Sequence, residues 1–216
     1  MAGPTPRGIR NSELKSRILH VAQQSVYQVK LQPPAEVVGY LNSGSRALNY
    51  SQSGEDVELM CSDVQLPGSD LITHDVTNDY AGVDEKLAYR RSYTNVAFTF
   101  MVNRRYDVIE MFDGWIDYIS GMSADQTQFA NRYASYRVAY PNDYRSDGVY
   151  ITKFEKDVGS DNASSYTDRM AIEYNFIGAY PISINPTAVG YGNKDVLKYT
   201  VNMNFIRYVR RRYQTS

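Results

Sequence analysis

The sequence holds few of the residues on which redox, metal and proton-transfer chemistry depends. Its 216 residues include one cysteine, Cys61, and two histidines, His20 and His74. A single cysteine cannot form an internal disulfide, which is consistent with folding in a reducing cytoplasm. We therefore expect a chain with no metal site and no cofactor, whose stability rests on its hydrophobic core.

The sequence also lacks an excess of charge of either sign and any long apolar run. Its 23 basic residues are balanced by 24 acidic ones, and the pI is near 6.1. This balance excludes a surface that is basic throughout, the usual property of proteins that grip nucleic acid. No apolar run approaches the ~20 residues that cross a bilayer. The first residues, MAGPTPRGIRNSELKSR, contain no apolar signal-peptide segment, so we expect no membrane partner.

Motifs of the common enzyme classes do not occur either. The chain has no G-x-S-x-G, G-x-x-x-x-G-K-[ST] or H-E-x-x-H segment. Gly190 and Gly192 supply two glycines of a dinucleotide fingerprint, but a strand is expected to follow them, which indicates a turn. Neighbouring carboxylates such as Asp84 and Glu85 have no apolar surroundings that would separate their pKa values. The sequence thus predicts a protein that is not an enzyme.

Tyrosine, by contrast, is abundant, with 20 copies. Its ring is apolar and its hydroxyl polar, so it suits half-buried pleated surfaces and interfaces. This abundance favours a β-rich protein, or one that buries surface against copies of itself.

Alternation of apolar and polar residues predicts several strands. The clearest is 197–205, where Lys198, Thr200, Asn202 and Asn204 face away from the apolar side chains, so that one face is buried and one is wet. Further strands are predicted over residues 26–31, 55–61, 96–102, 136–140, 149–154 and 170–176. Because there is one strong helix and no βαβ rhythm, the pattern predicts a mainly β protein, an antiparallel sandwich or barrel in a single domain over residues 1–216.

One amphipathic helix is predicted over residues 106–120. Its apolar stripe includes Phe112 and Trp115, and Gly121 suits the left-handed residue that ends a helix. We expect this helix to close the open end of the sandwich. A shorter helix is predicted over residues 11–23.

The remaining segments are expected to be arms, loops or a tail. We assign a flexible N-terminal arm to residues 1–10, an insertion loop to 39–55, an extended arm to 70–91, a connection to 178–192 and a basic C-terminal tail to 207–216. The cluster Arg207–Arg212 could contact phosphate or an acidic neighbour, but we favour a solvated or carboxylate-paired end.

Four landmarks follow one another along the chain. They are Met60–Gly68, the arm through Tyr80-Ala81-Gly82 and Arg90-Arg91, the helix Phe112–Gly121, and the step Ile177-Gly178-Ala179-Tyr180-Pro181-Ile182-Ser183 before the closing strand to Tyr208. In this order, over roughly residues 26–208, the chain resembles the tail-tube proteins of contractile-tailed, T-even-like bacteriophages. The loop 39–55 and the basic C-terminus depart from the pattern.

The resemblance implies a sandwich or barrel-like domain with one flanking helix, assembled into stacked hexameric rings inside a contractile sheath. Strands of neighbouring subunits would join into a barrel around a channel through which DNA is ejected. The implied partners are tail sheath, baseplate and terminator proteins, with assembly in the host cytoplasm and a final place in the virion tail. The same fold serves baseplate proteins that start a tube and terminators that end it, and both stay as alternatives.

Physical reasoning agrees with assembly, because open sheet edges invite pairing and head-to-tail contacts close rings. The polar arm 70–91 would become ordered between subunits. The candidate inter-subunit contacts are Tyr80, Arg90, Arg91, Arg210, Arg211 and Arg212. Since a conduit for DNA should not bind phosphate, we expect lumen-facing positions to be neutral or acidic and Arg207–Arg212 to lie elsewhere.

Two functions of other classes stay open. A tyrosine-rich sandwich could bind carbohydrate, which requires exposed coplanar aromatic rings in one groove. A single-strand nucleic-acid binder requires basic residues beside aromatic ones on one sheet face, and the face with Lys198 has no such aromatic platform.

Overall fold

The computed structural model of the chain describes residues 24–42, 48, 50–77, 82, 84–121, 138–154, 170–192 and 195–214. Along the chain these residues form β1 (Tyr27–Gln32), α2 (Ala35–Asn42), α3 (Tyr50–Leu59), β2 (Cys61–Val64), β3 (Ser69–Val76), β4 (Glu85–Tyr93), β5 (Val96–Met101), α4 (Asp107–Ser120), α5 (Pro141–Tyr144), β6 (Gly148–Phe154), β7 (Met170–Ile177), β8 (Tyr180–Ile184), β9 (Lys198–Asn204) and β10 (Arg207–Gln214). The expected N-terminal arm and the helix over 11–23 lie outside the described residues.

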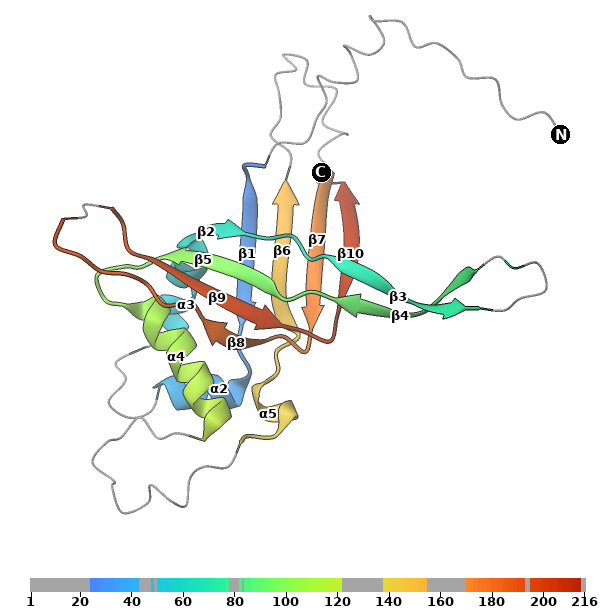
Figure 1. Cartoon of the computed structure of the whole chain (residues 1–216). Helices are drawn as coiled ribbons and strands as arrows, with labels where there is room; N and C mark the ends of the chain where they lie inside the picture. Colours follow the sequence, from blue (N-terminus) through green and yellow to red (C-terminus); the bar gives the residue numbers. More distant parts are fainter. Residues whose placement is uncertain are drawn as a thin grey trace, which may run out of the picture.

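Two antiparallel four-stranded sheets form the body. The first sheet has the strand order β1-β6-β7-β10 and the second β2-β5-β9-β8, while β3 and β4 form a separate two-stranded hairpin. In Figure 1 the second sheet lies in front of the first, and the strands of the two sheets cross at a steep angle. The mainly β, antiparallel sandwich predicted from the alternating pattern is confirmed.

The hydrophobic core lies between the two sheets. On the second sheet, Phe98, Phe100, Val201 and Met203 point inward and are at most 1% exposed. The first sheet contributes side chains that are at most 2% exposed: Val29, Leu31, Val149, Ile151 and Phe176. The alternation in the sequence therefore identified the inward faces of β1, β5 and β9, because successive side chains of a strand point to opposite faces.

Helix α4 covers the open side of this sandwich, as expected. Phe112 and Trp115 are 0% exposed, and the indole Nε1–H of Trp115 donates a hydrogen bond to the carbonyl oxygen of Tyr144 at 3.0 Å. Gly121 ends the helix with a φ of 71°, in the left-handed region that favours glycine. Tyr199 ties the helix to β9, since its hydroxyl donates to Asp113 at 2.7 Å.

The expectation of an insertion loop over 39–55 is wrong for the residues that the structure describes. Residues 39–42 belong to α2 and residues 50–55 to α3. Val37 and Leu41 of α2 and Val57 of α3 are buried at helical spacing, while glycine, serine and asparagine dominate the segment between them. Tertiary packing of a few apolar residues thus outweighs weak local helix propensity.

The strand expected over 55–61 is also wrong, for a related reason. Val57 and Leu59 look like an alternating pair, but both lie in α3, where Val57 is 1% and Leu59 79% exposed. The strand β2 begins only at Cys61. A short apolar alternation does not separate a strand from the end of a helix.

Three expectations near the C-terminal half also need correction. Residues 138–140 form no strand and lead into α5, and the connection 178–192 contains β8. The basic segment is not a tail, because β10 pairs with β7 along its whole length, from Arg207 opposite Ile177 to Gln214 opposite Met170. The run of arginines did not predict a strand, because these side chains are exposed while the backbone of β10 pairs with β7 and completes the sheet.

The core predicts a sharp contrast between two neighbouring residues of β5. Phe100 is 0% exposed and its ring centroid lies 5.1 Å from that of Phe112, so Phe100→Ala should lower the free energy of unfolding by about 3–5 kcal/mol. Thr99 faces the other way and shares a hydrogen bond with Thr200, so Thr99→Ala should cost about 1 kcal/mol or less. Chemical denaturation of both variants measures this, and equal losses would contradict the assignment of faces.

Candidate assembly surfaces

The outward face of the second sheet carries short, neutral polar side chains. The Thr99 and Thr200 hydroxyls lie 3.1 Å apart across β5 and β9. Asn202 donates to Ser183 Oγ at 2.9 Å and to Asn185 Oδ1 at 3.1 Å. These hydrogen bonds join neutral polar side chains of neighbouring segments on this face.

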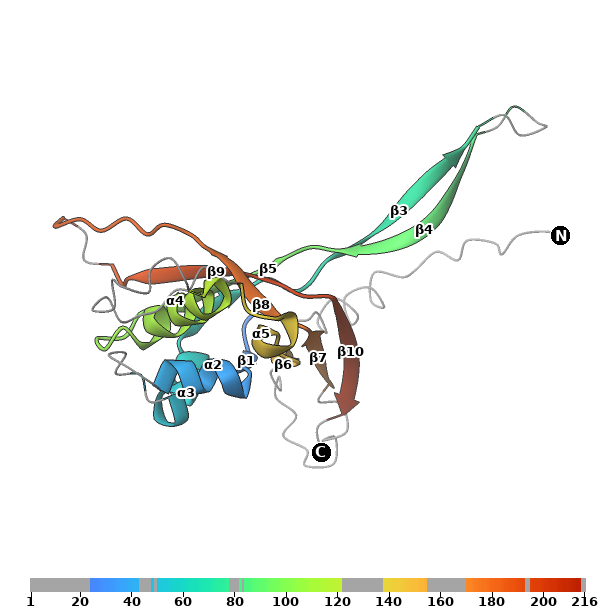
Figure 2. The same cartoon turned by 90° about the horizontal axis from the view of Figure 1, so that it is seen from below.

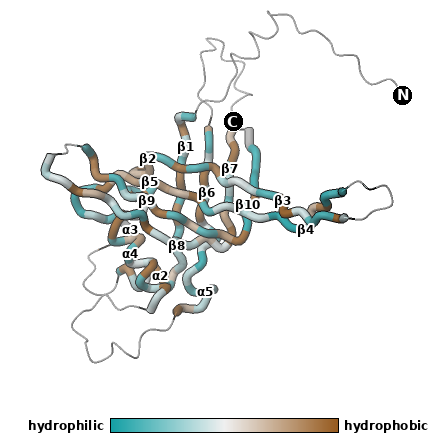
Figure 3. Tube along the Cα trace, in the orientation of Figure 1, coloured by the Kyte–Doolittle hydropathy of each residue, from teal (hydrophilic) through white to brown (hydrophobic). Residues whose placement is uncertain are grey.

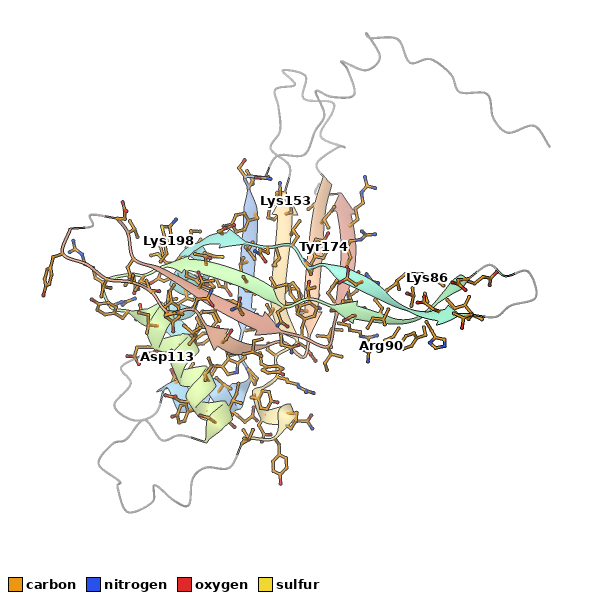
Figure 4. All side chains as sticks on the ribbon, in the orientation of Figure 1. Lys86, Arg90, Asp113, Lys153, Tyr174 and Lys198 are labelled. Atoms are coloured by element: carbon orange, nitrogen blue, oxygen red, sulfur yellow. The ribbon has the colours of Figure 1, made fainter. Side chains whose placement is uncertain are left out.

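Charge on this face is sparse and balanced. Pairing places Asp63 opposite Thr99, and Lys198 lies at the start of β9 on the same side as Thr200. Figure 4 shows Lys198 at the end of β9 where the strand begins. Among the described residues of the four strands, the outward face therefore bears one carboxylate and one ammonium and has no excess of either sign.

The hairpin β3–β4 extends away from the body. It continues the direction of β2 and β5 and reaches beyond both sheets (Figures 1 and 2). The arm expected over 70–91 is thus ordered as an antiparallel hairpin where the structure describes it. Leu71, Leu87 and Tyr89 are 66%, 55% and 66% exposed, and Figure 3 shows hydrophobic positions along the hairpin. Large apolar side chains on a projecting ribbon are typical of a contact surface.

The structure separates the residues that we selected as candidate contacts. Tyr80 lies outside the described residues. Arg90 is exposed on the hairpin (Figure 4), and Arg210, Arg211 and Arg212 are exposed on β10 of the first sheet. Arg91 alone bridges the two regions, because its guanidinium donates to the hydroxyl of Tyr208 on β10 at 3.0 Å.

The outer edge of the first sheet is partly covered by α3, which the sequence did not reveal. Leu31 of β1 donates its backbone N–H to Glu58 Oε1 at 2.7 Å and accepts a hydrogen bond from the Tyr50 hydroxyl at 2.6 Å. Two side chains thus take the place of a neighbouring strand at this residue. Burial raises the pKa of Glu58, and the bond from Leu31 opposes that rise.

Tyr27 makes a similar connection between β1 and β2. Its hydroxyl donates to the carbonyl oxygen of Cys61 at 3.1 Å, and burial raises the pKa of Tyr27 to about 12. Burial also raises the pKa of the Cys61 thiol to about 12, so the thiol is protonated and a poor nucleophile at neutral pH.

Within the described residues, no three His, Cys, Asp or Glu side chains form a group that could hold a metal ion. No helix in the same part of the chain is long and apolar enough to cross a membrane.

The burial of Glu58 predicts a pH dependence of stability. Because the pKa of Glu58 is raised from 4.5 in the folded state, the folded chain holds this proton more tightly than the unfolded chain, and this contribution to stability is lost as pH rises above 4.5. Glu58→Gln keeps an acceptor without titrating, so its stability relative to the parent should rise between pH 4 and 7 by less than about 1 kcal/mol, after allowance for solvent screening. Urea denaturation at each pH tests this, and a constant difference would contradict it.

No curated protein sequence matches the chain. Among solved structures, it is similar to a chain of the sheath–tube complex of an extracellular contractile injection system (PVC) in the extended state, with 12% identity, a TM-score of 0.48 and coverage of 94% of this chain and 99% of that one. It is also similar to a chain of the PVC sheath/tube terminator (11%, 0.45, 89% and 97%) and to an Hcp protein (10%, 0.39, 88% and 99%). The phage tail tube protein family matches residues 22–211. The chain therefore belongs to the phage tail tube protein family and is a structural component of a phage-like tail.

Proposed function

We propose that this chain is the repeating subunit of the tail tube, arranged in stacked hexameric rings around a channel through which DNA is ejected, with no catalytic role. The observation that carries the proposal is the outward face of the second sheet, which is polar and has no excess charge, in a member of this family. A wall with no excess of positive charge does not retain phosphate groups, which a conduit for DNA requires.

The edges of the second sheet support closure into a ring. Its outer strands are β2 and β8, and neighbouring strands within it run antiparallel. With four alternating strands, β8 of one copy and β2 of the next run in opposite directions when the copies are related by rotation. Pairing between them continues the antiparallel order around the channel and satisfies edge groups that would otherwise face water.

The other surfaces are assigned to further partners. The hairpin, with exposed Leu71, Leu87 and Tyr89 beside Arg90, makes contacts with another copy of the chain. Arg210–Arg212 belong to the first sheet, away from the neutral face, where they suit an acidic surface of the sheath, baseplate or terminator. The tube assembles in the host cytoplasm and becomes part of the virion.

Electron microscopy of the purified full chain tests the proposal. Hollow tubes of uniform width are expected. Single rings that do not stack would instead indicate an initiator or terminator of the tube, and monomers at high concentration would contradict assembly altogether.

The position of the neutral face has its own test. In a Cys61→Ala background, tubes of Asn202→Cys treated with a mercurial should show heavy-atom density on the channel wall in a cryo-electron microscopy map. Thr152→Cys on the first sheet is the matched control and should place density away from the channel. Density for Asn202→Cys on the outer surface would contradict the assignment.

A contact made by the hairpin predicts the effect of one charge. Leu71→Asp replaces an exposed apolar side chain with a carboxylate that must lose water on contact, so the tube yield at a given protein concentration should fall about tenfold or more. Thr73→Asp adds the same charge to β3 without removing an apolar group and should have a smaller effect. Sedimentation quantifies assembly, and equal effects would argue against an apolar contact at Leu71.

A further inference from the structure

The root of the hairpin is held by one arginine, Arg91, which makes four contacts with three residues. The guanidinium of Arg91 on β4 donates to Ser69 Oγ on β3 at 2.8 Å and to the Tyr208 hydroxyl on β10 at 3.0 Å. It also lies 5.1 Å from the ring centroid of Tyr93 and 5.4 Å from that of Tyr208, within range of a cation–π interaction. Both strands of the hairpin and the outer strand of the first sheet therefore meet at a single side chain.

The tyrosines under Arg91 connect it to the core. The ring centroid of Tyr208 lies 5.3 Å from that of Tyr93 and 5.6 Å from that of Tyr174, and Tyr93 lies 6.0 Å from Phe205. Figure 4 shows Tyr174 on the first sheet. Phe205 is only 6% exposed and packs against the ring of Phe176. Edge-to-face aromatic pairs of this kind fix relative orientation as well as distance.

Beyond this root the described hairpin has little to fix its direction. Its strands belong to neither main sheet, most of its side chains are exposed, and the ion pair between Lys86 and Asp75, at 3.9 Å, is exposed on both sides. A two-stranded ribbon is marginally stable by itself. Its angle to the body must therefore be set where it joins the body, at the level of Arg91.

We propose that Arg91 is a positioning residue that holds the hairpin at the angle required to reach another copy of the chain. This rests on the proposed role of the hairpin in assembly. Arg91 acts through the hairpin and makes its contacts within its own subunit. Lysine cannot replace it, because only the planar guanidinium can stack on two rings while donating to two oxygens.

The angle of the hairpin can be measured directly. In a Cys61→Ala background, spin labels are attached at His74→Cys on β3 and at Gln28→Cys on β1. Pulsed electron paramagnetic resonance on the dilute, unassembled full chain then reports the distance from the hairpin to the body. The distribution should be narrow, should broaden in Arg91→Ala and Arg91→Lys, and should broaden less in Tyr208→Phe, which keeps the ring. Arg90→Ala, which removes the same charge from the adjacent residue, should leave it narrow.

Assembly should change in parallel with the distance distribution. Arg91→Ala should raise the protein concentration needed for assembly about tenfold, and Arg91→Lys should not restore it, although lysine keeps the charge. The thermal unfolding midpoint of both variants should stay near that of the parent, which separates loss of position from loss of fold.

Two results would overturn the inference. One is an unchanged distance distribution in Arg91→Ala, and the other is a broadened distribution with normal assembly while Leu71→Asp still impairs it. If neither Arg91→Ala nor Leu71→Asp alters assembly, the proposed role of the hairpin fails as well.

Discussion

The structure depends on one constraint, which is that two four-stranded sheets share a core but cannot complete their own edges. Packing of the inward faces against each other and against α4 removes the apolar side chains of the core from water. Among the described residues, no further strand pairs with the outer strands of either sheet. Side chains bond a few of their backbone groups, as Glu58 and Tyr50 do at Leu31 and Tyr27 does at Cys61. In the proposed ring, each copy would supply the missing strand at the edge of its neighbour's sheet.

Tyrosine is what connects the layers of this fold. Tyr27, Tyr50 and Tyr199 each place a ring against apolar neighbours and direct the hydroxyl to a carbonyl or carboxylate on another element. Tyr208, at the edge of the first sheet, packs its ring against those of Tyr93 and Tyr174, and its hydroxyl accepts a hydrogen bond from Arg91. Such contacts tie helix to strand and sheet to sheet with a direction that apolar packing alone does not impose. The high tyrosine content therefore serves internal connection as well as any interface.

Sequence periodicity predicted the parts of the fold in which one face is buried along a whole element. The strand ending at Phe205 and the helix around Trp115 follow from strict spacing, since burial there repeats with the period of the backbone. The prediction of a loop over 39–55 was wrong because the few apolar residues there, among glycine, serine and asparagine, become helical only when they pack against the rest of the fold. The prediction of a basic tail over 207–216 was wrong because β10 forms by pairing with β7, whose backbone groups are distant in the sequence. The contacts of Arg91 could not be predicted from the sequence for the same reason, since Ser69, Tyr93 and Tyr208 come together only in the folded structure.

The short hydroxyl and amide side chains on the outward face of the second sheet have a consequence for transport. Thr99, Thr200 and Asn202 form hydrogen bonds to one another or to adjacent side chains. Part of their hydrogen-bonding capacity is therefore used within the face and is not available to another molecule. In the proposed tube, where this face would line the channel, a polyanion would meet few fixed charges along the wall. Its passage would then be resisted mainly by water and by the width of the bore, and would depend little on the ionic strength of the medium.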